Sequence, residues 1–186
     1  MRFKAEEREE AVRNAHILPL LGFVAGLVSA TANASAVDEQ AFIDLFGGSW
    51  AGSGTITVDS VPLQVSCRAT GRPNANRITI EGNCSVSVIN VRIAADITYD
   101  STCGCYSGTY IGAKVGPARV LGKRSGDVVN LAITWPKPVH GDTDARMTIE
   151  NAGRGSLRLR IFDNVVVGGP EEQTSEVLLS RTYYRN

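Results

Sequence analysis

From residue 50 onward, apolar residues alternate with polar or small ones, a period of two that is typical of β-strands with one buried face. The alternation is cleanest between Leu157 and Ile161, where Arg158 and Arg160 occupy the opposite face. Clusters of Gly, Pro, Asn and Asp separate the alternating stretches and predict turns. The pattern predicts about nine or ten strands, roughly at residues 50–58, 62–70, 77–87, 90–99, 105–112, 117–123, 127–135, 145–151, 156–166 and 174–182.

One stretch has the helical period instead. Residues 38–46 read DEQAFIDLF, with Asp38 as the predicted N-cap and Gly47 and Gly48 as the stop signal. The expected apolar stripe consists of Ala41, Phe42, Leu45 and Phe46. No later run is long enough for a crossover helix, so parallel strands joined by helices are excluded.

These elements predict an all-β domain in which consecutive strands pair as an antiparallel meander after one short N-terminal helix. A twisted meander of this length with one apolar face must close on itself or pack against a second sheet. We expect it to close into a β-barrel, and a β-sandwich is the alternative.

The N-terminus predicts export. Residues 17–28 form a twelve-residue apolar run, and the small residues Ala34-Ser35-Ala36 supply an A-x-A cleavage site. The expected division is a signal peptide at 1–36 and a β-barrel domain at 37–186, with the periplasm or the extracellular medium as the destination. An uncleaved anchor is the alternative, because residues 17–37 contain no charge.

Charge narrows the possible partners. The chain has 19 basic and 19 acidic residues. Four of each lie in the first thirteen positions, so the remainder is balanced as well. Nucleic-acid binding and polybasic membrane attachment both need clustered cations, so we expect no nucleic-acid partner and no membrane contact in the mature form.

All four cysteines follow the export segment, which predicts disulfides. Cys67 and Cys84 both lie on the apolar faces of their strands, and a hairpin turning near residues 74–77 places them opposite each other. A Cys67–Cys84 bridge is therefore expected. Cys103 and Cys105 are too close along an extended strand to bond unless the loop bends; a structural bridge, a redox-active pair, free thiols and intermolecular pairing remain open.

The segment FGGSWAGSG, which follows the predicted helix, resembles the opening of the lipocalins and related calycin barrels. In that superfamily the tryptophan closes the floor of the barrel, and a basic residue of the last strand lies across it. The resemblance implies a lipocalin-like barrel in which Arg181, from the final EVLLSR, packs on Trp50. The W-x-G-x-G-x-I pattern with the Cys67–Cys84 spacing is also similar to a group of small exported proteobacterial proteins of unknown function, a group that implies no activity.

No catalytic constellation is recognisable. His140 lies in one loop with Asp142 and Asp144, a pattern that we interpret as a polar turn, and no G-x-S-x-G motif is present. We therefore expect no enzyme, no cofactor and no metal site. Tyr106 and Tyr110 alternate on one strand and could line a ligand-binding mouth.

Two function classes remain. The first is a non-enzymatic barrel that binds a small, mostly apolar ligand. The second is a protein-interaction module of the cell envelope, such as a protease inhibitor, built on a filled barrel. The small residues expected to face inward would leave room for a ligand; they are Gly52, Gly54, Ala69, Gly82 and Ala95. The large residues that could fill this room are Trp50, Trp135 and Phe162.

Overall fold

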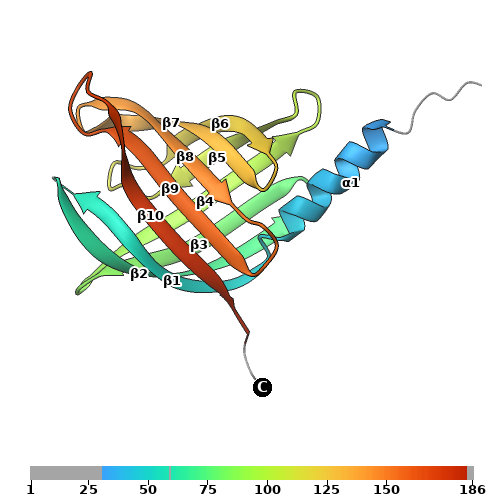
Figure 1. Ribbon diagram of the computed structural model, residues 1–186, viewed down its shortest axis with the longest axis horizontal. Helices are drawn as coiled ribbons and strands as arrows, with labels where there is room; N and C mark the ends of the chain where they lie inside the picture. Colours follow the sequence, from blue (N-terminus) through green and yellow to red (C-terminus); the bar gives the residue numbers. More distant parts are fainter. Residues whose placement is uncertain (1–30, 59, 184–186) are drawn as a thin grey trace, which may run out of the picture.

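The computed structural model describes residues 31–58 and 60–183, with side chains from residue 38 onward. It is a closed antiparallel barrel preceded by one helix, α1 (Thr31–Asp44) (Figure 1). The ten strands are β1 (Gly48–Val58), β2 (Val61–Asn74), β3 (Arg77–Val86), β4 (Ile89–Asp100), β5 (Cys105–Ile111), β6 (Ala118–Ser125), β7 (Val128–Val139), β8 (Asp142–Glu150), β9 (Ser156–Asn164) and β10 (Glu171–Thr182).

Closure comes from the pairing of the first strand with the last. Each strand pairs with its neighbour in sequence, and β1 pairs with β10 from Ser49 opposite Thr182 to Ile56 opposite Ser175. The barrel therefore has no open sheet edge. The predicted all-β meander and its closure are confirmed, and the sandwich alternative is wrong.

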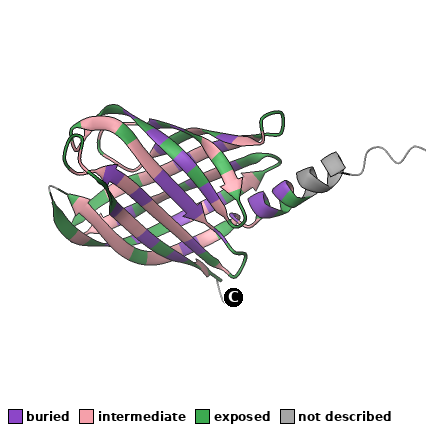
Figure 2. Ribbon diagram, turned by 45° about the horizontal axis from the view of Figure 1, so that its top comes forward, coloured by how far each residue is buried: buried purple, intermediate pink, exposed green. Residues whose placement is uncertain are grey.

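The barrel interior is formed by the apolar residues of the alternating pattern. Buried and exposed positions alternate along the strands (Figure 2), and Leu131, Ile133 and Met147 fill the middle of the barrel with at most 1% of each residue exposed. Phe162, expected as a possible inward residue, faces outward instead. The guanidinium carbon of Arg146 lies 4.0 Å from the centre of its ring.

The helix differs from its prediction at both ends. It begins at Thr31 rather than Asp38, so Asp38 is not the N-cap. It ends at Asp44 and is followed by a turn in which the Phe46 N–H donates to the Ile43 carbonyl at 3.1 Å. The buried face is the regular i, i+3, i+4, i+7 stripe that includes Glu39, a polar residue left out of the predicted stripe. Phe42, Ile43 and Phe46 are buried, whereas Ala41 is exposed.

The predicted export segment at residues 17–28 lies outside the described residues. The predicted cleavage site after Ala36 falls within α1. Among the described helices, none is long and apolar enough to span a membrane.

Both disulfides join cysteines that the sequence had singled out. Cys67 and Cys84 are directly opposed on β2 and β3, with a Cα–Cα distance of 4.0 Å, as predicted. Cys103 is bonded to Cys105, and the loop bends at Gly104, whose φ of +59° is readily available to glycine. Disulfides persist in oxidising compartments, so the pair of bridges indicates a location outside the cytoplasm.

Removing the Cys67–Cys84 bridge should lower stability clearly. The bond closes a loop of 17 residues, for which the chain-entropy model gives about 3 kcal/mol. We expect the double change to alanine to lower the free energy of unfolding by about this amount in chemical denaturation. The matched change at Cys103 and Cys105, which are 2 residues apart, should have a smaller effect. An equal loss in the two double variants would contradict this ranking.

Candidate functional site

The two ends of the barrel are built differently, and the end that carries α1 is closed. Carbonyl groups after the helix meet donors from the strands: the Phe46 carbonyl accepts from Trp50 Nε1 at 3.1 Å. The Leu45 carbonyl accepts from Asn151 Nδ2 at 3.0 Å and from Arg181 Nη2 at 2.7 Å. These bonds satisfy carbonyls that a helix end leaves without partners.

Trp50 and Arg181 form the centre of this closed end. They are opposed in the β1–β10 register, and the guanidinium carbon lies 4.9 Å from the centre of the indole ring. Trp50 is 1% exposed. The contact implied by the resemblance to calycin barrels is thus present.

A buried ion pair fastens the helix to the barrel wall beside this contact. Glu39 of α1 accepts from Arg124 Nε of β6 at 3.0 Å and from the hydroxyl of Tyr106 of β5. Asp38 accepts a further bond from Arg124, and the Arg124 guanidinium carbon lies 4.7 Å from the centre of the Phe42 ring. Glu39, Tyr106 and Arg124 are called the helix latch below.

The surroundings of the latch keep Arg124 charged and the Tyr106 hydroxyl protonated. Burial opposes the charge on Arg124, but the adjacent Glu39 and Asp38 carboxylates raise its pKa above the ordinary value. Burial, together with the bond to Glu39, likewise raises the pKa of Tyr106, so its hydroxyl stays protonated and donates. The latch has a structural role, because its groups are already satisfied by one another.

The opposite, open end contains two of the three buried side-chain atoms without partners in the described chain, and the third is Arg181 Nε at the closed end. Asp163 of β9 is 2% exposed and Trp135 of β7 is 4% exposed. Within the described part of the protein, neither Asp163 Oδ1 nor Trp135 Nε1 has a partner with full hydrogen-bond geometry, although the indole N–H lies near enough to the Asp163 carboxyl to favour its charged form. The Tyr110 ring lies 6.2 Å from the Trp135 ring, centre to centre, and Thr174 is buried nearby on β10, where its hydroxyl is 3.4 Å from the Ile161 carbonyl. Asp163, Trp135, Tyr110 and Thr174 are called the mouth cluster.

The charge of Asp163 is disfavoured where it lies. Burial raises the pKa of this carboxyl and the nearby Asp142 adds to the rise, while His140, the Asn164 backbone N–H and the Trp135 indole N–H lower the pKa only in part. Burial also raises the pKa of Tyr110 to about 12. Buried polar atoms without partners cost free energy, so they commonly mark a place where water or a ligand binds.

The raised pKa of Asp163 predicts a pH dependence of stability. A carboxyl whose folded-state pKa exceeds its unfolded value, about 3.9, holds its proton more tightly in the folded state. Ionisation of Asp163 therefore lowers the free energy of unfolding as pH rises from about 4 through the raised pKa. Asp163→Asn should match the wild type near pH 3 and exceed its stability near pH 7, measured by denaturation at both values. A constant difference between the two proteins across this range would contradict the assignment.

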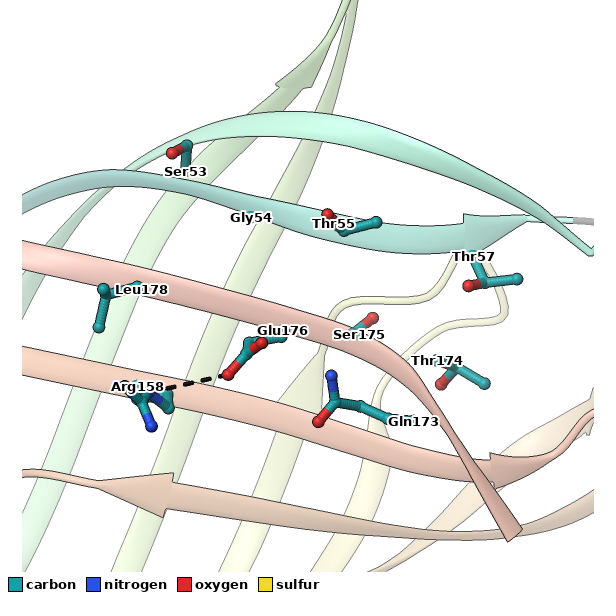
Figure 3. Close-up of a pocket in the computed structure, with 10 residues that line it drawn as sticks. All are labelled: Ser53, Gly54, Thr55, Thr57, Arg158, Gln173, Thr174, Ser175, Glu176 and Leu178. Carbon is teal, nitrogen blue, oxygen red and sulfur yellow. Dashed lines mark ion pairs between the residues drawn. The ribbon is translucent and has the colours of Figure 1, made fainter. Parts of the chain in front are cut away.

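Two hollows on the outer wall are weaker candidates for a ligand site than the mouth cluster. One of about 390 Å³ lies over the β1–β10 seam (Figure 3), and its charged members Arg158 and Glu176 are paired with each other at 3.7 Å. The other, of about 670 Å³, lies over β1, β2 and β3 and includes the exposed residues Arg68 and Glu81. Both are open and lined mainly by outward side chains, which suits solvent better than a specific ligand.

The remaining residues singled out in the sequence do not converge. His140 sits at the β7–β8 turn with a φ of 54°, and Asp142 caps that turn by accepting from the Asp144 N–H at 3.0 Å. No group of three or more metal-ligating side chains occurs among the described residues. Tyr106 and Tyr110 both face inward but lie at opposite ends, the first in the helix latch and the second in the mouth cluster.

Comparison with known proteins supports the fold alone. No family model matches the chain, and a search of curated proteins finds no match. Among solved structures, "Crystal Structure of Rv2717c from M. tuberculosis" superposes with a TM-score of 0.58 at 16% identity, covering 83% of this chain and 99% of that one. At this identity the similarity establishes a shared barrel architecture and carries no activity across.

Proposed function

We propose that this protein is a non-enzymatic barrel, exported to the periplasm or secreted, that binds a small and mostly apolar ligand at its open end. The observation that carries the proposal is the pair of buried, unpartnered atoms in the mouth cluster, Asp163 Oδ1 and Trp135 Nε1. Ligand sites in barrels are largely apolar with a few polar groups that fix orientation, and the mouth cluster has this character.

The chemistry of the two atoms indicates the polar end of the ligand. The indole N–H of Trp135 can only donate, and Asp163 Oδ1 accepts when the carboxyl is ionised. A hydroxyl group can accept from the first and donate to the second. The matching ligand is an apolar molecule with a hydroxyl at one end, whose apolar body would contact Tyr110 and the surrounding aliphatic residues.

The architecture supports access from one direction. Trp50, Arg181 and the helix latch close the end that carries α1, and Leu131, Ile133 and Met147 fill the middle. A ligand would therefore occupy only the open-end part of the barrel. Half-buried apolar residues at this end, Ile56, Val86, Ala113, Val115 and Val139, would form its surroundings.

Native mass spectrometry of protein recovered after export from its own cells tests the proposal. We expect an additional retained mass on the wild type and on the control Asp144→Asn, which changes an exposed carboxylate at the same end. Trp135→Phe, which keeps the ring but removes the N–H, should retain much less. No retained mass on the wild type would contradict ligand binding and would favour the alternative of a protein-interaction module.

A further inference from the structure

Exposed aliphatic side chains gather at the open end. Val88 is 92% exposed, and Val166 and Val167 are 66% and 69% exposed. They belong to a set of six that occupy three hairpin tips: Val58 and Val61 between β1 and β2, Val88 and Ile89 between β3 and β4, and Val166 and Val167 between β9 and β10. We call these six residues the aliphatic arc.

The three tips are consecutive around the barrel. Because β10 pairs with β1, the strand order places the β9–β10 tip beside the β1–β2 tip, which in turn neighbours the β3–β4 tip. Figure 1 shows these tips at the end opposite α1. The two other hairpins of this end carry Lys114, Lys137 and Asp142, and the arc tips have acidic residues of their own, Asp59 between β1 and β2 and Glu171 and Glu172 at the start of β10. Among the described residues of this end, the exposed large aliphatic side chains are therefore confined to three consecutive tips.

The other exposed large apolar residues of the described chain do not form such a group. Leu121 and Leu178 lie singly on the outer wall, and Tyr183 follows β10 at the closed end. Scattered exposed apolar residues are normal on protein surfaces, whereas a cluster confined to one end marks an interaction surface.

The dimensions of the arc favour a lipid surface over a protein partner. Six small aliphatic side chains expose on the order of a few hundred Å², divided among three projecting tips. A stable protein interface buries roughly 800 Å² on each partner as a continuous, shape-matched patch. Separate tips can instead enter a fluid interface independently, because lipid rearranges around each of them.

The charges of this end indicate the class of lipid. Lys114 and Lys137 are outnumbered by the acidic residues of this end, which are Asp59, Asp142, Asp144, Glu171 and Glu172, so the mouth has no basic excess that would select anionic lipid. Attachment through this end would depend on apolar insertion. It should therefore occur on zwitterionic phospholipid and respond weakly to salt.

We propose that the aliphatic arc docks the open end of the barrel onto a zwitterionic phospholipid bilayer. This revises the expectation of no membrane contact in the mature form, which rested on charge balance and therefore addressed only electrostatic attachment. The proposal extends the proposed function, because a mouth that faces lipid could exchange an apolar ligand with it. It stands on the arc alone and does not require that a ligand be found.

Partitioning onto phosphatidylcholine vesicles, measured by flotation with protein recovered after export of the full chain, tests the proposal. The arc variant is Val88→Asp with Val166→Asp, and the matched control is Leu121→Asp with Leu178→Asp on the wall. All four positions are exposed, so both variants should fold, which circular dichroism checks. Losing the burial of one valine weakens partitioning by about tenfold, so the arc variant should lose about a hundredfold and the control should match the wild type.

Three results would overturn the proposal. They are absence of wild-type binding, equal binding by the arc variant, and equal loss in both variants. Any contribution of the N-terminal apolar segment would be the same in all proteins, so it cannot produce the expected difference. Self-association that only the arc variant abolishes, without vesicle binding, would identify a second copy of the chain as the partner instead. Vesicle binding and retained ligand mass are separate measurements, so failure of either proposal can be recognised without the other.

A second measurement locates the contact. Amide hydrogen exchange at the three arc tips should slow when vesicles are added, while exchange in the closed-end turns near residues 75, 126 and 153 should not change. Protection at the closed end instead would contradict docking through the mouth.

Discussion

Trp50→Ala is expected to lower the free energy of unfolding by about 3–5 kcal/mol. Trp50 is 1% exposed and joins three parts of the closed end: its strand, the carbonyl of Phe46 and the guanidinium of Arg181. Truncation leaves a cavity at the barrel floor and removes the donor from a buried carbonyl. Chemical denaturation of the two proteins, fitted with a common slope, measures the loss.

The contact between Trp50 and Arg181 can be isolated by a double-mutant cycle. Arg181→Ala removes both the cation over the indole and the bond to the Leu45 carbonyl, so a cost of about 1–3 kcal/mol is expected. The double variant should lose less than the sum of the single variants, because the pair contributes only once. Strict additivity would mean that the indole and the guanidinium are energetically independent.

Arg124→Ala should produce a loss of similar size, about 3–5 kcal/mol. The substitution leaves the Glu39 carboxylate buried without a cation, since Tyr106 then supplies its remaining side-chain bond. Breaking a buried pair from one side is costly because the other charge cannot return to water. Thermal and chemical unfolding should both register the loss, and the helical signal should melt before the β signal because α1 loses its attachment.

The matched control for this variant is Arg72→Ala. Arg72 also forms an ion pair, with Glu81 at 3.3 Å, but its side chain is 65% exposed. Exposed pairs contribute at most about 1 kcal/mol. Similar losses in the two variants would mean that burial of the helix latch has no energetic importance.

Most of the fold could be predicted from the sequence because the barrel wall obeys one local rule. The period-two alternation determines which residues face inward, and face parity placed Cys67 opposite Cys84. Strand ends were harder to predict. The predicted strand 127–135 stopped before Pro136, but β7 continues to Val139. Proline is tolerated there because the pairing of β7 with β8 shifts register between Thr134 and Val139, so the backbone N–H that proline lacks is not needed for regular pairing.

The site residues depend on contacts that no local pattern contains. Glu39 and Arg124 are 85 residues apart, and a glutamate on a short helix gives no sign of its partner. In the sequence, Asp163 is a polar residue at the next inward position after the apolar series Leu157, Leu159 and Ile161. That irregularity was the signal that could have identified the mouth cluster. The aliphatic arc needed the closed topology, because its three tips come together only when β10 pairs with β1.

The most direct test of a barrel sealed at one end and ligand-binding at the other uses its two tryptophans. Trp50 lies in the closed end and Trp135 in the mouth cluster, so the two indole N–H signals in a ¹⁵N spectrum report on opposite ends. Decanol, an apolar chain with one hydroxyl, is the probe. Titration should shift the Trp135 signal with saturation and leave the Trp50 signal in place. A shift of the Trp50 signal, or no shift of either, would contradict ligand binding at the open end.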